Sequence, residues 1–137
     1  MTVDEIMTKD PVVASETTTL GEALEILSEL EIRHLPVVRD GDLVGMLSDR
    51  DLRILGLSLI NDLESMSSLR SHLNARVSSL MTGDVITVDR DASIREVVEL
   101  MISEKVGAIP VVETDTATLV GIVSYIDILQ AFGDRLD

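Results

Sequence analysis

Apolar residues recur at helical spacing in two stretches of the chain, residues 20–30 and 94–101. The first carries Leu20, Ala23, Leu24, Leu27 and Leu30, and the second carries Ile94, Val97, Val98 and Met101. Such spacing is typical of the buried face of an amphipathic helix. Thr19 stands three residues before Glu22, and Ser93 three before Glu96, which is the spacing of a capping box. The sequence therefore predicts two helices with capped N-termini.

Short apolar runs typical of strands surround each predicted helix. In the first half they are residues 11–14, 36–38 and 43–47, and the second half has counterparts that begin with residues 85–88. The second and third runs flank Asp40 and Gly41, a dipeptide that favours a β-hairpin. A further helix is expected to begin near Ser48 and near Ser124. The resulting order, β-α-β-β-α, predicts a parallel strand pair joined through a helix, with an antiparallel hairpin added.

The two halves of the chain are copies of one another. Residues 3–8 return 74 positions later, as do residues 35–38, and residues 43–48 return 76 positions later. A longer turn at residues 113–118 holds the two-residue insertion that reconciles these offsets. A duplicated unit usually packs against its copy. We therefore expect an α/β (α+β) fold of two β-α-β-β-α repeats packed with pseudo-two-fold symmetry, and any pocket in one repeat should recur in the other.

The expected division of the chain is repeat one at residues 1–55, a helical linker at 56–76 and repeat two at 77–137. In the linker region the apolar residues Leu55, Leu59, Leu63, Met66 and Leu73 are spaced as in an amphipathic helix. The same spacing also fits two helices broken near Gly56 or near residues 65–68. The apolar stripe packs either against its own domain or against a partner.

Composition excludes several classes of function. The chain has 137 residues, 45% of them hydrophobic and 1% aromatic, no cysteine and a net charge of −14. An aliphatic core with almost no aromatic rings offers nothing for nucleic-acid bases to stack on, and the negative charge repels nucleic acid and anionic membranes. No apolar run approaches membrane-spanning length, and the polar N-terminus is unlike a secretory signal. We expect a cytoplasmic protein without nucleic-acid or membrane partners.

A Gly-x-x-Ser-x-x-Asp pattern at a strand-to-helix junction occurs in both repeats, with Ser48 and Asp51 in the first and Ser124 and Asp127 in the second. A serine at a helix start can present its hydroxyl and nearby free N–H groups to an anion. An aspartate one turn later can accept hydrogen bonds from the two vicinal hydroxyls of a ribose. The alternative is that each pair is only a helix cap.

Nothing in the chain is typical of a catalytic centre, so no enzyme activity is predicted. The two histidines, His34 and His72, are distant in sequence and lack metal-ligand spacing. No serine stands in a nucleophile-elbow pattern. A hydrolase acting on a bound nucleotide would lack both a general base and a metal site.

Across nearly its whole length the chain resembles a tandem pair of cystathionine-β-synthase (CBS) domains, a Bateman module. The resemblance is carried by residues 6–13, 32–38 and 43–52 and by their counterparts in the second repeat. It implies a regulatory module that binds adenosine-containing ligands in two clefts. The ligands that it implies are AMP, ADP or ATP, with Mg²⁺ accompanying ATP, and less commonly S-adenosylmethionine or a cyclic dinucleotide.

The resemblance also assigns roles to individual residues. Asp51 and Asp127 match the acid that binds ribose, and Ser48 and Ser124 match the hydroxyl that contacts phosphate. The strand that lines the family's adenine pocket is matched by Val12, Val13, Ile86 and Thr87. The apolar wall of that pocket is matched by Leu35 with Pro36 and by Ile109 with Pro110.

The two repeats differ in charge near the expected cleft. Repeat one has Arg33, His34, Arg50 and Arg53, and the positions equivalent to the first three hold Gly107, Ala108 and Ile126 in repeat two. Charge-assisted hydrogen bonds are about twice as strong as neutral ones, so this contrast favours a phosphate chain beside the first three residues. Arg50 has the alternative of pairing with Asp49 or with Glu side chains, and His34 that of simple packing. Because the two expected clefts converge, the cations of repeat one are placed to serve the phosphate of either repeat's ligand.

The sequence thus predicts a non-catalytic sensor of adenine nucleotides that forms a homodimer and reports to an effector protein. The alternative is an interaction or dimerisation module that binds no nucleotide.

Overall fold

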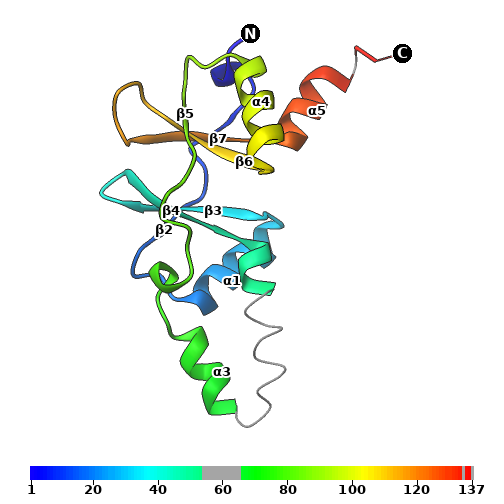
Figure 1. The fold of residues 1–137 in the computed structure, drawn as a ribbon. Helices are drawn as coiled ribbons and strands as arrows, with labels where there is room; N and C mark the ends of the chain where they lie inside the picture. The colour runs from blue at the N-terminus through cyan, green and yellow to red at the C-terminus, as the bar shows by residue number, and fades with distance from the viewer. Residues whose placement is uncertain (54–65, 134, 137) are drawn as a thin grey trace. The chain divides into compact units, whose positions relative to one another are not determined.

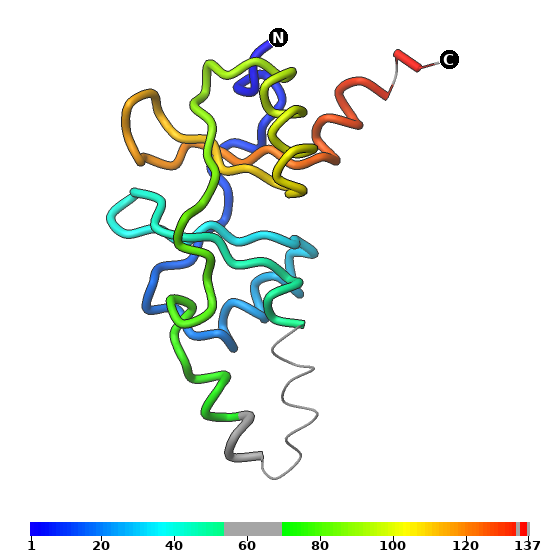
Figure 2. The backbone as a smooth tube through the Cα atoms, in the orientation of Figure 1, coloured from blue at the N-terminus to red at the C-terminus, as the bar shows by residue number. Residues whose placement is uncertain are grey.

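The structure is a computed structural model that describes residues 1–53, 66–133 and 135–136, with residues 66–69 described by their backbone alone. The chain divides into two compact units (Figures 1 and 2). The repeat-two unit holds Met1–Pro11, Gly41–Leu43 and Val85–Asp137, and the repeat-one unit holds Val12–Asp40 and Val44–Asp84.

The repeat-two unit is built on a four-stranded sheet in the order β1-β7-β6-β5. Its strands are β1 (Thr8–Lys9), β5 (Val88–Asp89), β6 (Ala108–Val112) and β7 (Leu119–Ser124). Strand β5 runs parallel to β6, whereas β7 is antiparallel to both β6 and β1. Helices α4 (Ile94–Glu104) and α5 (Tyr125–Gly133) lie on one side of this sheet (Figure 1). The core between them is aliphatic, with Val97, Val111 and Val123 fully buried.

The repeat-one unit has a three-stranded sheet in the order β2-β3-β4. Its strands are β2 (Ala14–Ser15), β3 (His34–Arg39) and β4 (Asp42–Ser48), of which the first two residues of β4 belong to the repeat-two unit. Its helices are α1 (Leu20–Leu30), α3 (Met66–Leu73) and one whose described part is residues 49–53. Strand β2 is parallel to β3. Leu20, Ala23 and Leu27 of α1 pack on Leu35, Val37 and Leu47 of the sheet to form the core.

Each unit contains the short segment that comes before the other repeat along the chain: residues 1–11 belong to the repeat-two unit, and residues 76–84 belong to the repeat-one unit. Thr8 of β1 pairs with Ile122 in the repeat-two unit, and its counterpart Thr82 pairs with Met46 in the repeat-one unit. Both segments begin with a 3₁₀ turn, η1 (Val3–Glu5) and η2 (Val77–Ser79), whose valine is fully buried. The spatial units therefore do not follow the order of the repeats along the sequence.

The mixed α/β class and the predicted order of elements in each repeat are confirmed. The Asp40-Gly41 turn has positive φ at both residues, 52° and 84°, as a two-residue hairpin requires. Helix α1 begins at its predicted capping box, because the Glu22 N–H donates to Thr19 Oγ1 at 3.1 Å. At α4 the Glu96 N–H donates to Ser93 Oγ at the same distance.

The predicted strands at residues 11–14 and 85–88 are longer than the observed ones, and the predicted linker is described only in part. The runs predicted as strands at residues 11–14 and 85–88 are paired only from Ala14 and Val88 onward. The preceding residues, 11–13 and 85–87, adjoin the boundaries of the two units along the chain and belong to no strand. Within the predicted linker at residues 56–76 the structure has a helix at Met66–Leu73 and no helix at residues 74–76, and residues 56–65 lie outside the described residues.

Candidate functional site

In the repeat-one unit, Ser48 and Asp51 form a reciprocal pair where β4 ends and a helix begins. The Ser48 N–H donates to Asp51 Oδ2 at 3.0 Å, and the Asp51 N–H donates to Ser48 Oγ at 3.0 Å. This is the geometry of a capping box, with aspartate in the place of the usual glutamate. The structure thus brings the two predicted residues together in a helix cap.

Ser124 and Asp127 form the same pair at the end of β7. The Ser124 N–H donates to Asp127 Oδ2 at 2.9 Å, and the Asp127 N–H donates to Ser124 Oγ at 3.2 Å. All four side chains are half-buried. In both pairs the serine hydroxyl keeps its hydrogen for donation, and the Oδ1 atom of each aspartate accepts no hydrogen bond from the part of the chain that the structure describes.

The backbone donors at these junctions are mostly occupied, which changes the expected anion site. Besides the serine and aspartate N–H groups, the Asp49 N–H donates to the Arg33 carbonyl at 2.8 Å and the Tyr125 N–H donates to the Gly107 carbonyl at 3.0 Å. The first turn of each helix therefore has few free N–H groups to offer a phosphate. An anion near either junction would have to be held mainly by side chains.

Arg33 and His34 lie beside the Ser48–Asp51 pair. The hydrogen bond from Asp49 to the Arg33 carbonyl joins the start of β3 to the end of β4. Burial lowers the pKa of His34, and Arg33 lowers it further, although the charges of Asp51 and Asp49 oppose this shift. His34 is therefore a neutral imidazole at neutral pH, able to donate one hydrogen bond and accept another.

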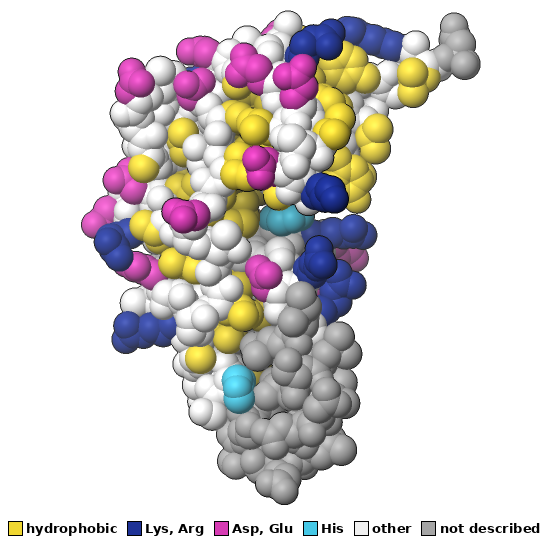
Figure 3. Space-filling model, in the orientation of Figure 1, with side chains coloured by type: hydrophobic (Ala, Val, Ile, Leu, Met, Phe, Trp, Pro, Cys, Tyr) yellow, Lys and Arg dark blue, Asp and Glu magenta, His cyan; other side chains and the backbone are white. Residues whose placement is uncertain are grey.

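Two of the predicted cations are exposed and make no ion pair within the described part of the chain, namely Arg33 and Arg50. Among the described residues Asp49 pairs with Arg53, whose Nε lies 3.4 Å from Asp49 Oδ2, and not with Arg50. On the face shown in Figure 3, Lys and Arg side chains gather in small groups, whereas Asp and Glu side chains are scattered. Arg33 and Arg50 are thus available to an anionic ligand.

In the repeat-two unit an aromatic ring takes the place of this charge. Gly107, the counterpart of Arg33, faces Tyr125, since a Cβ added to the glycine would lie 3.3 Å from Tyr125 Cδ1. Tyr125 and Ile126 are 42% and 44% exposed. The sequence analysis did not select Tyr125, although the only tyrosine of the chain follows Ser124 directly. A ligand here would meet an apolar surface.

The residues expected to line an adenine pocket are placed unequally. Val12 and Val13 are 46% and 37% exposed, and they precede β2, on the opposite side of β3 from Ser48. In repeat two, Ile86 is half-buried and Thr87 is exposed. Pro36 and Pro110, expected in the apolar wall, are fully buried within β3 and β6. Alternation along β3 puts Pro36 on the same strand face as His34.

Two further features of the described residues limit the possible sites. They contain no group of three or more His, Asp or Glu side chains arranged to hold a metal ion. No helix among them is long and apolar enough to cross a membrane.

Comparison with known proteins identifies the family. The model of the CBS domain matches residues 3–57 and again residues 77–134. The chain belongs to the CBS domain family. A CBS domain-containing protein of Dictyostelium discoideum is 34% identical over 132 residues, covering 93% of this chain and 88% of that protein. Protein MJ1225 of Methanocaldococcus jannaschii is 29% identical over 131 residues, covering 95% of this chain but only 46% of its own length.

Solved CBS pairs have the same fold. The structure of CBSX2 in complex with AMP superposes with a TM-score of 0.81 at 28% identity, covering 98% of this chain and 97% of CBSX2. The CBS domain pair of protein MJ0100, in complex with 5′-methylthioadenosine and S-adenosyl-L-methionine, gives a TM-score of 0.79 at 28% identity and covers 99% and 98% of the two chains.

The chain spans much less of some curated relatives. It matches 46% of MJ1225 and 23% of inosine-5′-monophosphate dehydrogenase of M. jannaschii.

Proposed function

We propose that this protein is a non-catalytic regulatory module that binds adenine nucleotides. The observation that carries the proposal is the Ser-Asp pair at the same junction in both repeats, with exposed Arg33 and Arg50 beside the first pair. The AMP complex of CBSX2 and the adenosine-compound complexes of MJ0100 support an adenosine-containing ligand. Repeat one is assigned to residues 1–55, the linker to 56–76 and repeat two to 77–137.

The Ser-Asp pairs fit a ribose in hydrogen-bonding capacity. A carboxylate has about four lone-pair sites, and each aspartate uses one oxygen in the cap. The Oδ1 atoms of Asp51 and Asp127 can therefore accept from the ribose hydroxyls while the caps stay intact. The serine hydroxyl can donate to a phosphate oxygen at the same time as its oxygen accepts the aspartate N–H.

Because the two repeats differ in charge, we assign a different ligand to the Ser-Asp site of each repeat. Arg33 and Arg50 supply the positive charge that a di- or triphosphate needs in a chain of net charge −14, so we assign ADP or ATP to repeat one. The Tyr125 ring near Gly107 favours AMP or an uncharged adenosine compound in repeat two. Since the described residues form no metal cluster, Mg²⁺ would be held through the phosphates of ATP.

The wider proposal is a homodimer that reports to an effector protein in the cytoplasm. Apolar side chains on α4 and α5 support a self-association surface, because Ile102 is 71%, Ile126 44% and Leu129 58% exposed. Large exposed apolar groups on neighbouring helices are typical of an interface.

Isothermal titration calorimetry with adenosine, AMP, ADP, ATP and S-adenosylmethionine tests the proposal. We expect two sites per chain, with the ADP and ATP affinities lowered by Arg33→Ala at one of them. Ligand binding should also raise the melting temperature, because a ligand that binds only the native state stabilises it. Absence of heat and of any thermal shift with all five compounds would favour the alternative, an interaction module without nucleotide.

A further inference from the structure

Each unit contains an ion pair at the same place in its sheet, but the two pairs have opposite orientation. In the repeat-two unit, Arg90 follows β5 and its Nη1 lies 2.6 Å from Oε2 of Glu113, which follows β6. In the repeat-one unit, Glu16 follows β2 and pairs with Arg39 at the end of β3, with Nη2 and Oε2 2.7 Å apart. Residues 16 and 90, and residues 39 and 113, are 74 positions apart and therefore equivalent.

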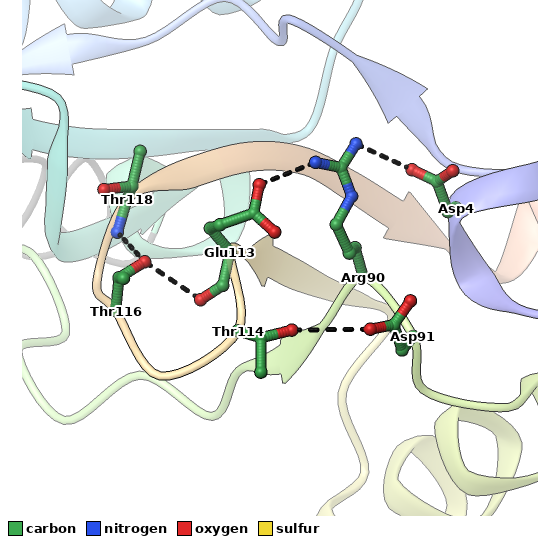
Figure 4. A network of polar contacts seen from close by, with 7 residues as sticks. All are labelled: Asp4, Arg90, Asp91, Glu113, Thr114, Thr116 and Thr118. Carbon is green, nitrogen blue, oxygen red and sulfur yellow. Dashed lines mark hydrogen bonds and ion pairs between the residues drawn. The ribbon is translucent and has the colours of Figure 1, made fainter.

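The segment that docks beside each ion pair carries the complementary charge. Asp4 of the N-terminal segment reaches Arg90, with Oδ1 3.1 Å from Nη2, so that Arg90 bridges Asp4 and Glu113 (Figure 4). The counterpart of Asp4 is the uncharged Ser78, and the segment at residues 76–81 begins instead with Arg76. Arg76 forms a backbone bridge with Thr19, three residues after Glu16, although the Arg76 and Glu16 side chains are not within ion-pair distance. The hydrogen bond from Arg39 lowers the pKa of Glu16, and the charge of Arg76 acts in the same direction. An acidic segment thus docks near Arg90 and a basic segment near Glu16.

The main backbone contact and the buried methionine contact of the two segments are alike, whereas their internal side-chain bonds differ, from Thr2 to Glu5 in one and from Ser79 to Arg76 in the other. The Val3 N–H donates to the Ala92 carbonyl at 2.8 Å, and the equivalent Val77 N–H donates to the Thr18 carbonyl at 2.8 Å. In both units a methionine of the docked segment lies against a strand glycine, Met7 against Gly121 and Met81 against Gly45. These backbone bonds and the shared valine and methionine do not distinguish one segment from the other, and Ile6 and Leu80 differ only in the shape of an aliphatic side chain. The largest difference between the correct and the exchanged pairing therefore lies in the charges.

We propose that the reversed ion pairs select which N-terminal segment docks on which repeat, with Arg90 accepting the acidic segment at residues 2–7 and Glu16 accepting the basic segment at residues 76–81. The exchanged pairing would place Asp4 near Glu16 and Arg76 near Arg90. Like charges at these positions act against the wrong partner, which is how interfaces with similar apolar contacts gain specificity.

Disulfide trapping in the full chain can read the pairing, because the protein has no cysteine of its own. Thr2 forms an antiparallel bridge with Ser93, and the equivalent bridge joins Arg76 to Thr19. The flanking hydrogen bonds, Val3 to Ala92 and Ile94 to Met1, make Thr2 and Ser93 a non-hydrogen-bonded pair, whose Cα atoms are about 4.5 Å apart. That separation suits a disulfide. T2C/S93C therefore reports the observed pairing, and T2C/T19C reports the exchanged one.

The two cysteine pairs form a matched comparison, since each removes Thr2 and one helix cap. In the wild-type charge background we expect T2C/S93C to oxidise readily and T2C/T19C to oxidise slowly. The variant E16R/R39E/R90E/E113R keeps both ion pairs but reverses each of them. It should shift the ratio of the two cross-links toward T2C/T19C by on the order of tenfold at low salt, and by less at 1 M salt.

A compensating variant separates charge selection from general damage. Adding D4S/S78D to the four-fold variant moves the acidic residue to the other segment and should shift the ratio back toward the wild-type value, with Arg76 beside the arginine that E16R introduces preventing full restoration. An unchanged ratio in the four-fold variant would overturn the proposal and assign the pairing to chain connectivity. If the four-fold variant does not fold, R90E/E113R alone must slow the T2C/S93C cross-link severalfold, and an unchanged rate there would overturn the proposal equally.

Discussion

The side chain of Met7 lies directly over the α-carbon of Gly121, although the two residues belong to different repeats of the sequence. A Cβ added to Gly121 would stand 2.5 Å from Met7 Sδ and 2.9 Å from the Thr8 carbonyl oxygen. Gly45 meets Met81 in the same way in the other unit. The glycine of the Gly-x-x-Ser-x-x-Asp pattern is therefore required by the docked N-terminal segment, which approaches the strand too closely for any side chain.

The first prediction concerns this contact. Gly121→Ala should lower the free energy of unfolding by about 1–3 kcal/mol, because the added methyl forces the docked segment away from β7. Urea denaturation monitored by circular dichroism gives the value. Gly83→Ala is the matched control, since a Cβ there meets nothing within 4 Å, and it should change stability by less than about 0.5 kcal/mol. Equal stability of the two variants would mean that the segment is not held against Gly121.

Asp127 is expected to combine a cap with a ligand contact, and two substitutions separate these roles. Asp127→Ala should cost about 1 kcal/mol of stability by removing the acceptor for the Ser124 N–H. Asp127→Asn keeps an acceptor but loses the charge, so it should retain most of the stability while weakening AMP binding about tenfold, as expected for a lost charged hydrogen bond. Calorimetry measures both, with Asp84→Ala as an exposed acidic control. Unchanged AMP affinity in Asp127→Ala and Asp127→Asn would leave Asp127 with the cap alone.

Arg33→Ala should reduce ATP affinity by about tenfold or more and leave adenosine affinity unchanged, because the guanidinium is available only for phosphate. The effect should shrink at high salt, where exposed charges are screened. Arg95→Ala, which removes an exposed arginine from α4, is the control for net charge. A similar loss for adenosine and ATP would show that Arg33 shapes the pocket and does not bind phosphate.

The lowered pKa of His34 has two consequences with a defined sign. In the unfolded chain this histidine takes up a proton near its ordinary pKa of about 6.5, whereas in the folded chain it does so only at lower pH. His34 therefore contributes stability above a pH of about 6.5, and this contribution is lost progressively as the pH falls from there to the lower pKa of the folded chain. Urea midpoints measured between pH 7.5 and 5 should decline more for the wild type than for His34→Gln.

The second consequence is a proton linkage to ligand binding. A polyphosphate beside His34 would raise its pKa, so ATP affinity should increase as the pH falls through the range in which the bound histidine gains its proton. Calorimetry in buffers of different ionisation enthalpy would detect proton uptake. Binding of ATP without proton uptake at pH 6, in both wild type and His34→Gln, would place the phosphates away from this side chain.

The dimer proposal makes a further prediction. Leu129→Glu introduces a charge into the exposed apolar part of α5, which should turn a dimer into a monomer because a buried unpaired charge is costly. Light scattering at micromolar concentration measures the mass, and Gln130→Glu on the exposed neighbouring position is the control. A wild-type protein that is already monomeric, with and without ligand, would contradict the proposal.

Much of this protein follows from the sequence because the determinants are local. The spacing of Leu20, Ala23 and Leu27 sets the buried face of α1, Thr19 marks its start, and the Asp40-Gly41 turn fixes the hairpin through positive φ angles. The duplicated pattern indicated the CBS domain family and predicted the position of both Ser-Asp pairs. Each of these features depends on residues that are close together along the chain, so a period or a dipeptide is enough to predict it.

Tertiary structure alone decided the features that depend on distant residues. The exchange of the segments that begin at Val3 and Val77 is invisible in the sequence, because both segments carry nearly the same apolar pattern. The bridge from Asp4 to Arg90 spans 86 positions. The neutral state of His34 and the occupied N–H of Asp49 likewise depend on burial and on a neighbouring strand. Charges and donors acquire their chemistry from what surrounds them, and only the folded chain determines that.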